Sequence, residues 1–220
     1  MTRYGKDVII RVLSFSLIID GAAYFINNTV IKILLLFLSI LLFGITAYFF
    51  RDPKRQVPDD LEDGTILSPA DGKVVLIKEV ENSYPDFFTG EEKLKQVSIF
   101  LSPLDVHVNR IPFSGIIKYL KYIKGDYIVA FDEKSSARNE RTEIGILDNC
   151  GRKVLFKQIA GYVARRIVYE LTELQEVKAG EKFGMIKFGS RADILLTSGS
   201  KIKVSDGDKV KGGVSVIASV

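Results

Sequence analysis

Residues 183–220, FGMIKFGSRADILLTSGSKIKVSDGDKVKGGVSVIASV, indicate the fold class of most of this chain. Short apolar runs alternate here with glycine, aspartate and serine at the spacing of β-hairpins. The same texture extends back to about residue 67, and no long amphipathic helical pattern interrupts it. We therefore predict a mainly β domain, built as a barrel or as a sandwich of two packed sheets.

The tail of this region, residues 204–220, resembles the end of biotinyl- and lipoyl-type barrel-sandwich domains. Such domains offer a lysine on a hairpin tip for modification, and the residues around Lys187 lack that arrangement. The resemblance therefore supports the architecture and implies nothing about function.

The N-terminal part has a different composition, with apolar runs over residues 8–26 and 30–50. Each run is about long enough to cross a hydrocarbon core of about 30 Å. The second run carries only Lys32 as a charged residue, whereas the first contains two charges, one of them Asp20. We predict a transmembrane helical hairpin over residues 1–50, with a re-entrant or interfacial first helix as the alternative.

Basic residues flank the hairpin on both sides, in TRYGK (residues 2–6) and RDPKR (residues 51–55). Because lysine and arginine near span ends favour the cytoplasmic side, we expect both ends of the hairpin to face the cytoplasm. Residues 51–66 are polar and contain proline, which is typical of a linker. The predicted location is the cell membrane, with the β-rich domain, residues 67–220, on the cytoplasmic side.

The bulk composition excludes several classes of site. The net charge is +4, and no motif that reads DNA or RNA is visible, so no nucleic-acid partner is expected. A single cysteine, Cys150, excludes an internal disulfide and a cysteine-based metal cluster. A single histidine, His107, excludes metal sites built on several histidines, and we predict no metal.

Five short segments of the β-rich region are specific in combination. They are LSPADG (67–72), FLSPLDVHVNRIP (100–112), NER (139–141), QIAGYVARRIV (158–168) and FGSRAD (188–193). In this order they resemble the phosphatidylserine decarboxylase family in its shorter form. The resemblance runs from about Arg51 to the C-terminus, and the apolar N-terminal part also fits it.

The resemblance implies that the chain cleaves itself between Gly189 and Ser190. The Ser190 hydroxyl would attack the Gly189 carbonyl and convert the amide into an ester, for which glycine offers an unobstructed carbonyl. Loss of the Ser190 α-proton would expel the ester carboxylate, and the dehydroalanine left behind would hydrolyse to a pyruvoyl group and ammonia. The products would be a heterodimer of fragments 1–189 and 190–220, and a higher homo-oligomer is left open.

A pyruvoyl group derived from Ser190 is therefore the cofactor that the resemblance implies. It acts as an electron sink, as pyridoxal phosphate does. Its ketone would form a Schiff base with the serine amine of a membrane phospholipid, and carbon dioxide would leave. The implied activity converts phosphatidylserine, or a serine-headed archaeal lipid, into the ethanolamine lipid.

Serine needs a base to attack an amide, and His107 is the only imidazole in the chain. The resemblance assigns Asp71 of the LSPADG segment to orient this histidine. An arrangement of Asp71, His107 and Ser190 would then follow the logic of a catalytic triad.

Arginines are the candidates for binding the lipid head group. Arg110 stands where the longer bacterial branch of the family has a second histidine, and its guanidinium suits a phosphate or carboxylate. Arg165 and Arg166 occupy a β-like run, so one of the two is expected to face the site. We expect Arg191 either beside the pyruvoyl carbonyl or as an exposed charge, and Lys187 and Asp193 at the flanks of a strained turn.

Two other functions remain open from the sequence. A membrane-tethered barrel-sandwich module without catalytic activity would explain the β-rich tail and the anchor. A pyruvoyl-dependent decarboxylase of a soluble amino acid would explain the motifs. A lipid substrate explains in addition why the domain is attached to a bilayer.

Overall fold

The computed structural model divides the chain into two compact units, Met1–Pro53 and Lys54–Val220. The residues that it describes are 1–59, 61–126, 128, 138–161, 166–187 and 190–220.

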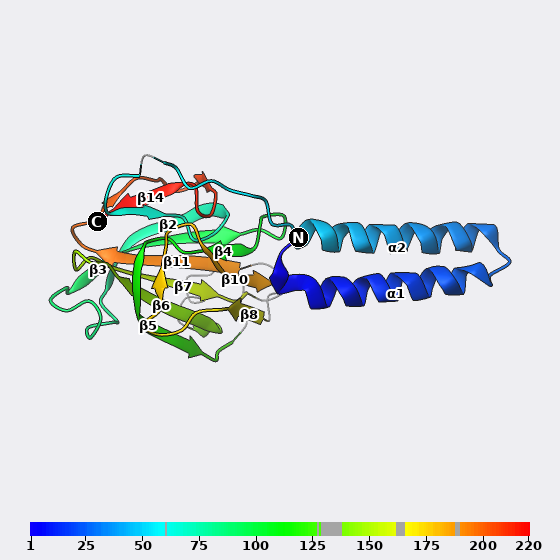
Figure 1. Ribbon diagram of the computed structural model, residues 1–220, viewed down its shortest axis with the longest axis horizontal. Helices are drawn as coiled ribbons and strands as arrows, with labels where there is room; N and C mark the ends of the chain where they lie inside the picture. The colour runs from blue at the N-terminus through cyan, green and yellow to red at the C-terminus, as the bar shows by residue number, and fades with distance from the viewer. Residues whose placement is uncertain (60, 127, 129–137, 162–165, 188–189) are drawn as a thin grey trace. The chain divides into compact units, whose positions relative to one another are not determined.

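The first unit is a pair of helices that lie side by side (Figure 1). A 3-10 turn, η1 (Arg3–Gly5), leads into α1 (Lys6–Tyr24), and α2 (Thr29–Phe49) follows. The Asn28 side chain caps α2 by accepting hydrogen bonds from the backbone N–H groups of Val30 and Ile31.

A polar contact joins the two helices in the middle of their apolar sequence. The Ser39 hydroxyl of α2 donates a hydrogen bond of 3.2 Å to Asp20 of α1, which gives the acidic residue of the first run a partner. Within the described part of the chain, α2 is the helix long and apolar enough to cross a membrane. The predicted helix pair is confirmed.

The second unit is built from β-strands, which confirms the prediction of a mainly β domain. The strands are β1 (Thr65–Leu67), β2 (Gly72–Glu81), β3 (Lys93–Leu101), β4 (Val108–Arg110), β5 (Gly115–Ile123), β6 (Arg141–Leu147), β7 (Lys153–Ile159), β8 (Arg166–Tyr169), β9 (Glu176–Val177), β10 (Lys182–Lys187), β11 (Ser190–Thr197), β12 (Lys201–Ile202), β13 (Lys209–Val210) and β14 (Val216–Ser219).

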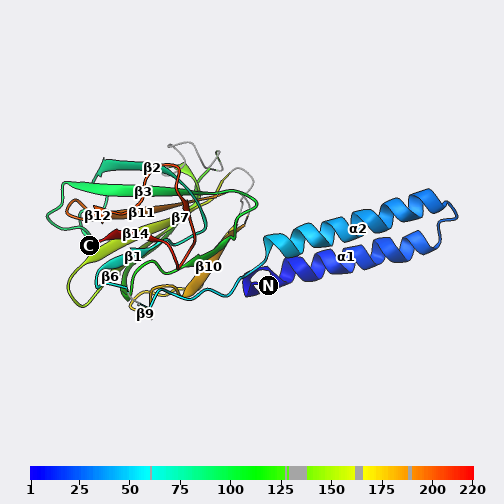
Figure 2. The ribbon, with the colours of Figure 1, turned by 90° about the horizontal axis from the view of Figure 1, so that it is seen from above.

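These strands form one large antiparallel sheet and two small ones. The large sheet has the order β13-β2-β3-β11-β7-β6-β5-β9 and curls around the core (Figure 2). The small sheets have the orders β1-β14-β12 and β4-β10-β8. Since β11 lies between β3 and β7, residues near the C-terminus occupy the centre of the large sheet.

Strand β11 presents two chemically different faces. Ile194 and Leu196 point into the main apolar core, as the alternation of a strand requires. Arg191 and Asp193 point to the other face and are nevertheless buried. Asp193 therefore lies inside a strand, and the expectation that it flanks a turn is wrong, because the β-run begins at Ser190.

The second face of the sheet carries a row of paired charges. Asp193, Lys157 and Glu143 are neighbours across β11, β7 and β6. Burial lowers the pKa of Lys157, although the two carboxylates raise it. Burial raises the pKa of Glu143. Hydrogen bonds from Arg141 and Tyr84 lower it by more, so the net pKa is below its usual value. Pairing of opposite charges thus outweighs burial for Glu143, whereas for Lys157 burial outweighs the pairing and the net pKa is lowered.

Candidate active site

Ser190 is the first residue of β11, and its side chain is fully buried. Its Cα partner across the ladder is Leu101, the last residue of β3. Within the described residues, the Ser190 hydroxyl has no hydrogen-bond partner. Gly189, the other half of the predicted cleavage site, lies outside the described residues. A buried hydroxyl without a partner is costly, so its retention calls for a functional explanation.

The segment LSPADG lies against the start of β11. Ala70 packs with Leu101 and Ala192 in a small buried cluster. The Pro69 carbonyl accepts a hydrogen bond of 2.9 Å from the Arg110 backbone N–H. Three of the segments that the sequence singled out therefore meet around the beginning of one strand.

His107 is held in the same region by the backbone. It is fully buried and directly precedes β4, and its carbonyl accepts a hydrogen bond of 3.3 Å from the backbone N–H of Ile186 in β10. The ring atom Nδ1 lies 2.9 Å from the backbone carbonyl oxygen of Asp105. Since a carbonyl only accepts, Nδ1 carries the proton and the neutral ring keeps its lone pair on Nε2. The Asp105 carbonyl thus favours the tautomer in which Nε2 carries the lone pair.

Asp71 is bound by an arginine that the sequence analysis did not single out. Arg55 donates hydrogen bonds to both carboxylate oxygens of Asp71, and the Gly212 backbone N–H donates a third, of 2.9 Å. The contact between Asp71 and His107 stays a prediction. The sequence offers one hint of Arg55, the basic cluster RDPKR, which also indicates the membrane orientation.

The arginines proposed for the head group lie in different surroundings. Arg110 is buried, and its Nη1 donates a hydrogen bond of 2.9 Å to the Gly180 carbonyl. Arg166 is exposed at the start of β8, where its Cα partner is Lys187 at the end of β10. Arg165 lies outside the described residues. Of the two that the structure describes, Arg166 is therefore the one with an exposed side chain, and its strand partner Lys187 directly precedes the cleavage segment in the sequence.

Arg191 does not occupy the expected place. Its guanidinium is 1% exposed and binds Asp193 at 2.6 Å and the Ser98 hydroxyl at 2.7 Å. Neighbouring residues of a strand point to opposite faces, so this side chain faces away from that of Ser190. The Arg191 side chain is therefore neither next to the Ser190 side chain nor exposed to solvent, which contradicts both expectations for it.

The remaining two motifs join the same region through buried amides. Gln158 donates a hydrogen bond of 2.9 Å to Asn109, two residues after His107. Asn139 donates one of 2.7 Å to the carbonyl of Ala160. All five segments are therefore linked by described contacts.

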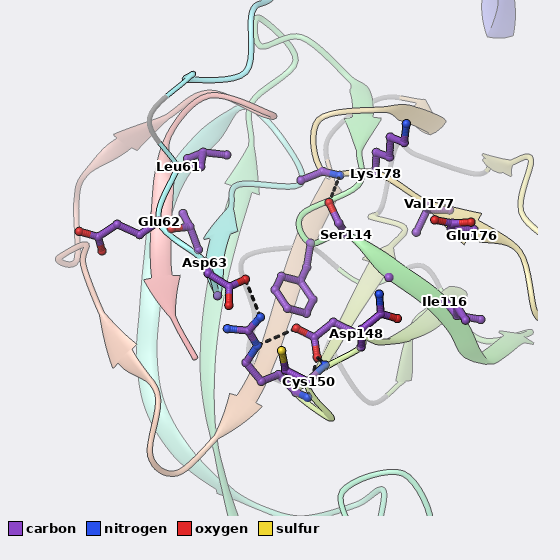
Figure 3. A pocket seen from close by; sticks show the side chains of 17 residues that line it. Leu61, Glu62, Asp63, Ser114, Ile116, Asp148, Cys150, Glu176, Val177 and Lys178 are labelled. Carbon is purple, nitrogen blue, oxygen red and sulfur yellow. Dashed lines mark hydrogen bonds and ion pairs between the residues drawn. The ribbon is translucent and has the colours of Figure 1, made fainter.

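A pocket of about 830 Å³ lies elsewhere in the β unit (Figure 3). Its lining includes Asp63, Ser114, Asp148 and Arg152, and none of the predicted site residues. Arg152 directly precedes β7, whose beginning pairs with the last residues of β11. The pocket thus adjoins the end of β11, whereas the converging motifs surround its beginning.

Comparison with known sequences gives a consistent picture. The protein-family model with the description Phosphatidylserine decarboxylase matches residues 42–218 of this chain. A phosphatidylserine decarboxylase proenzyme of Prosthecochloris aestuarii (strain DSM 271 / SK 413) is 44% identical over 219 residues, which cover 98% of this chain and 95% of the relative. The proenzyme of Salinibacter ruber (strain DSM 13855 / M31) is 46% identical, over 80% of this chain and 76% of the relative. That of Amoebophilus asiaticus (strain 5a2) is 49% identical, over 79% and 74%.

Proposed function

Because the chain belongs to the phosphatidylserine decarboxylase family, we propose that it removes the serine carboxyl group of phosphatidylserine and yields the ethanolamine lipid. The observation that carries this proposal is the convergence of the family segments on the start of β11, where Ser190 is buried next to the Ala70 cluster. The relatives are named proenzymes, which supports a chain that must be processed before it acts.

The proposed processing begins with His107. Nε2 takes the proton from the Ser190 hydroxyl as the oxygen attacks the Gly189 carbonyl carbon. The new C–O bond replaces the C–N bond, and the histidine returns its proton to the nitrogen of residue 190. Elimination then releases residues 1–189 with a free carboxylate, and hydrolysis of the resulting dehydroalanine leaves a pyruvoyl group and ammonia.

The surroundings of residue 190 fit such a group. Among the described residues, the Ser190 hydroxyl is buried and makes no hydrogen bond, so the departure of its oxygen with the Gly189 carboxylate breaks no described hydrogen bond. The backbone of β11 would hold the group in place through its pairing with Leu101 and the following residues of β3. When formed, a pyruvoyl group supplies the electron sink that decarboxylation of an amino acid head group needs.

The two fragments are expected to stay together after cleavage. Residues 190–220 contribute β11 between β3 and β7, β14 beside β1, and β13 beside β2. Three strands of the smaller fragment thus make four pairings with the larger one, so a stable heterodimer of the cleavage products is the expected mature form.

We also propose that the enzyme works at the cytoplasmic face of the cell membrane. The length and apolarity of α2, and the basic residues around the helix pair, support this location. Arg166 is the preferred head-group ligand because its guanidinium is exposed, whereas the Arg110 side chain is buried and bonded to Gly180.

Intact-mass analysis of the detergent-purified chain tests the proposal. We expect two species that correspond to residues 1–189 and to a pyruvoyl-blocked 190–220, together with carbon dioxide release from phosphatidylserine vesicles. Ser190→Ala is the matched control and should remain a single inactive chain. An active wild-type preparation that consists of one uncleaved chain would overturn the pyruvoyl mechanism. Equal activity on free serine would overturn the lipid substrate.

A further inference from the structure

Arg55 makes a two-pronged ion pair near the site, although it comes from the segment predicted to be a linker. Its guanidinium binds both oxygens of Asp71, and the side chains of Arg55 and Asp71 are only 10% and 13% exposed. A planar guanidinium matches a carboxylate in this two-pronged geometry, which an ammonium group cannot reproduce.

The same guanidinium also contacts the other cleavage fragment. Arg55 Nη1 donates a hydrogen bond of 2.8 Å to the Gly212 carbonyl, while the Gly212 N–H binds Asp71 at 2.9 Å. Arg55, Asp71 and Gly212 thus form a closed ring of hydrogen bonds. Since Gly212 belongs to residues 190–220, this ring spans both sides of the predicted cleavage point.

The backbone around the ring is tightly packed. A Cβ atom added to Gly180 would lie 2.2 Å from Cγ2 of Val57, two residues after Arg55. A Cβ atom added to Gly212 would lie 3.2 Å from the backbone of Ala70. The segment around Arg55 is therefore packed closely against the β unit. Through its hydrogen bonds to Asp71, Arg55 restrains the position of Asp71 and of the neighbouring Ala70.

We propose that Arg55 is a positioning residue for the self-cleavage reaction, acting through Asp71. Ala70, beside Asp71, packs on Leu101 and Ala192, which flank Ser190 across and along the sheet. By fixing the Asp71 carboxylate, Arg55 sets both the charge beside the LSPADG segment and the placement of that segment against the start of β11. This inference rests on the proposed function, because its readout is the maturation at Ser190.

Arg55→Ala and Arg55→Lys test the inference in the full-length chain, with the rate of cleavage after synthesis followed by gel electrophoresis. We expect Arg55→Ala to mature about 10- to 100-fold more slowly, since a hydrogen-bonded charge pair contributes on the order of one to two factors of ten. Arg55→Lys should recover part of the rate. Lys54→Ala is the matched control, because the neighbouring lysine is exposed and its loss changes the net charge equally.

Chemical rescue separates positioning from a general loss of stability. Ethylguanidinium added to Arg55→Ala should speed cleavage, whereas ethylammonium at the same ionic strength should not. Wild-type maturation of Arg55→Ala, or equal rescue by both ions, would overturn the inference. If Arg55→Ala is insoluble, Arg55→Lys decides: slow cleavage with a wild-type thermal midpoint supports positioning, and wild-type cleavage contradicts it. A wild-type chain that does not cleave in this assay would instead contradict the proposed function.

Discussion

Both ends of strand β11 adjoin an arginine that binds acidic side chains, but water reaches Asp71 and Asp63, one acidic partner at each end, very differently. At the beginning of the strand, Arg55 and Asp71 are 10% and 13% exposed. At its end, Arg152 is 22% exposed, and its partner Asp63 is 82% exposed beside the open pocket of Figure 3. The Arg55–Asp71 pair is therefore largely withdrawn from solvent, whereas the Arg152–Asp63 pair exposes its carboxylate to water.

The difference teaches which end of the β unit is built for chemistry. Withdrawing charges from water is costly unless they are paired, and it strengthens their action on neighbouring groups. The buried Ser190 and His107 share the first environment. Ion pairs in the second environment contribute little, because water and salt screen them. Substitutions at the beginning of β11 should therefore affect maturation, and those at its end should not.

Replacement of His107 should have the largest effect. We expect His107→Ala to slow self-cleavage about 100- to 10,000-fold, the usual loss when a general base is removed. Cleavage is measured by intact mass over time after synthesis. Arg152→Ala is the control from the other end and should mature at the wild-type rate. Full cleavage of the His107→Ala chain would show that histidine is not needed for maturation. The two ends of β11 would then not differ in their effect on cleavage.

Replacement of Asp71 should have the next largest effect. Asp71→Asn keeps the size of the side chain but removes the charge that Arg55 binds through both oxygens. We expect cleavage to slow about 10- to 100-fold, the order expected for a charge-assisted hydrogen bond. The gel assay for maturation measures it, with thermal unfolding as the check on folding. Normal cleavage of Asp71→Asn would show that this carboxylate is structural.

The Arg191–Asp193 pair should affect stability more than chemistry. Asp193→Ala would leave the guanidinium of Arg191, which is 1% exposed, without its carboxylate partner. We expect a loss of about 3–5 kcal/mol in the free energy of unfolding, as for other broken buried pairs. Urea unfolding of Ser190→Ala and Ser190→Ala/Asp193→Ala chains measures this loss. The Ser190→Ala background is used because it is not expected to be cleaved. Arg138→Ala removes a pair that is 61% and 56% exposed, and it should cost far less.

Glu143 should make stability depend on pH in the acid range. Its pKa in the folded protein is below the usual 4.5: burial raises it, but hydrogen bonds from Arg141 and Tyr84 lower it by more. A lowered folded pKa stabilises the native state above the unfolded value, and this stabilisation is lost as the pH falls through the folded pKa. Glu143→Gln should cost about 1–3 kcal/mol at pH 7, as for other hydrogen bonds to charged groups. The gap to wild type should close in acid, and a gap independent of pH would contradict the assignment.

The sequence predicted the parts of this protein that depend on local pattern. The helix pair followed from two long apolar runs, and the β unit from short runs between turn residues. Arg55 and Asp71 could not be paired in this way, because their contact depends on how distant segments fold together. Asp193 looked like a turn residue for the same reason, since its burial depends on Lys157 and other residues of neighbouring strands.

Replacement of Asp63 should have the smallest effect on cleavage. It therefore serves as a control for the comparison between the two ends of β11. A hydrogen bond from Arg152 lowers the pKa of the Asp63 carboxyl, which is ionised at neutral pH. Its side chain is nevertheless 82% exposed, and Arg152 keeps a second partner in Asp148 at 2.6 Å. Asp63→Asn should therefore leave both the cleavage rate and the thermal midpoint within experimental error of wild type. A slowed cleavage in Asp63→Asn would mean that the end of β11 is coupled to its beginning, and that burial alone does not separate the two.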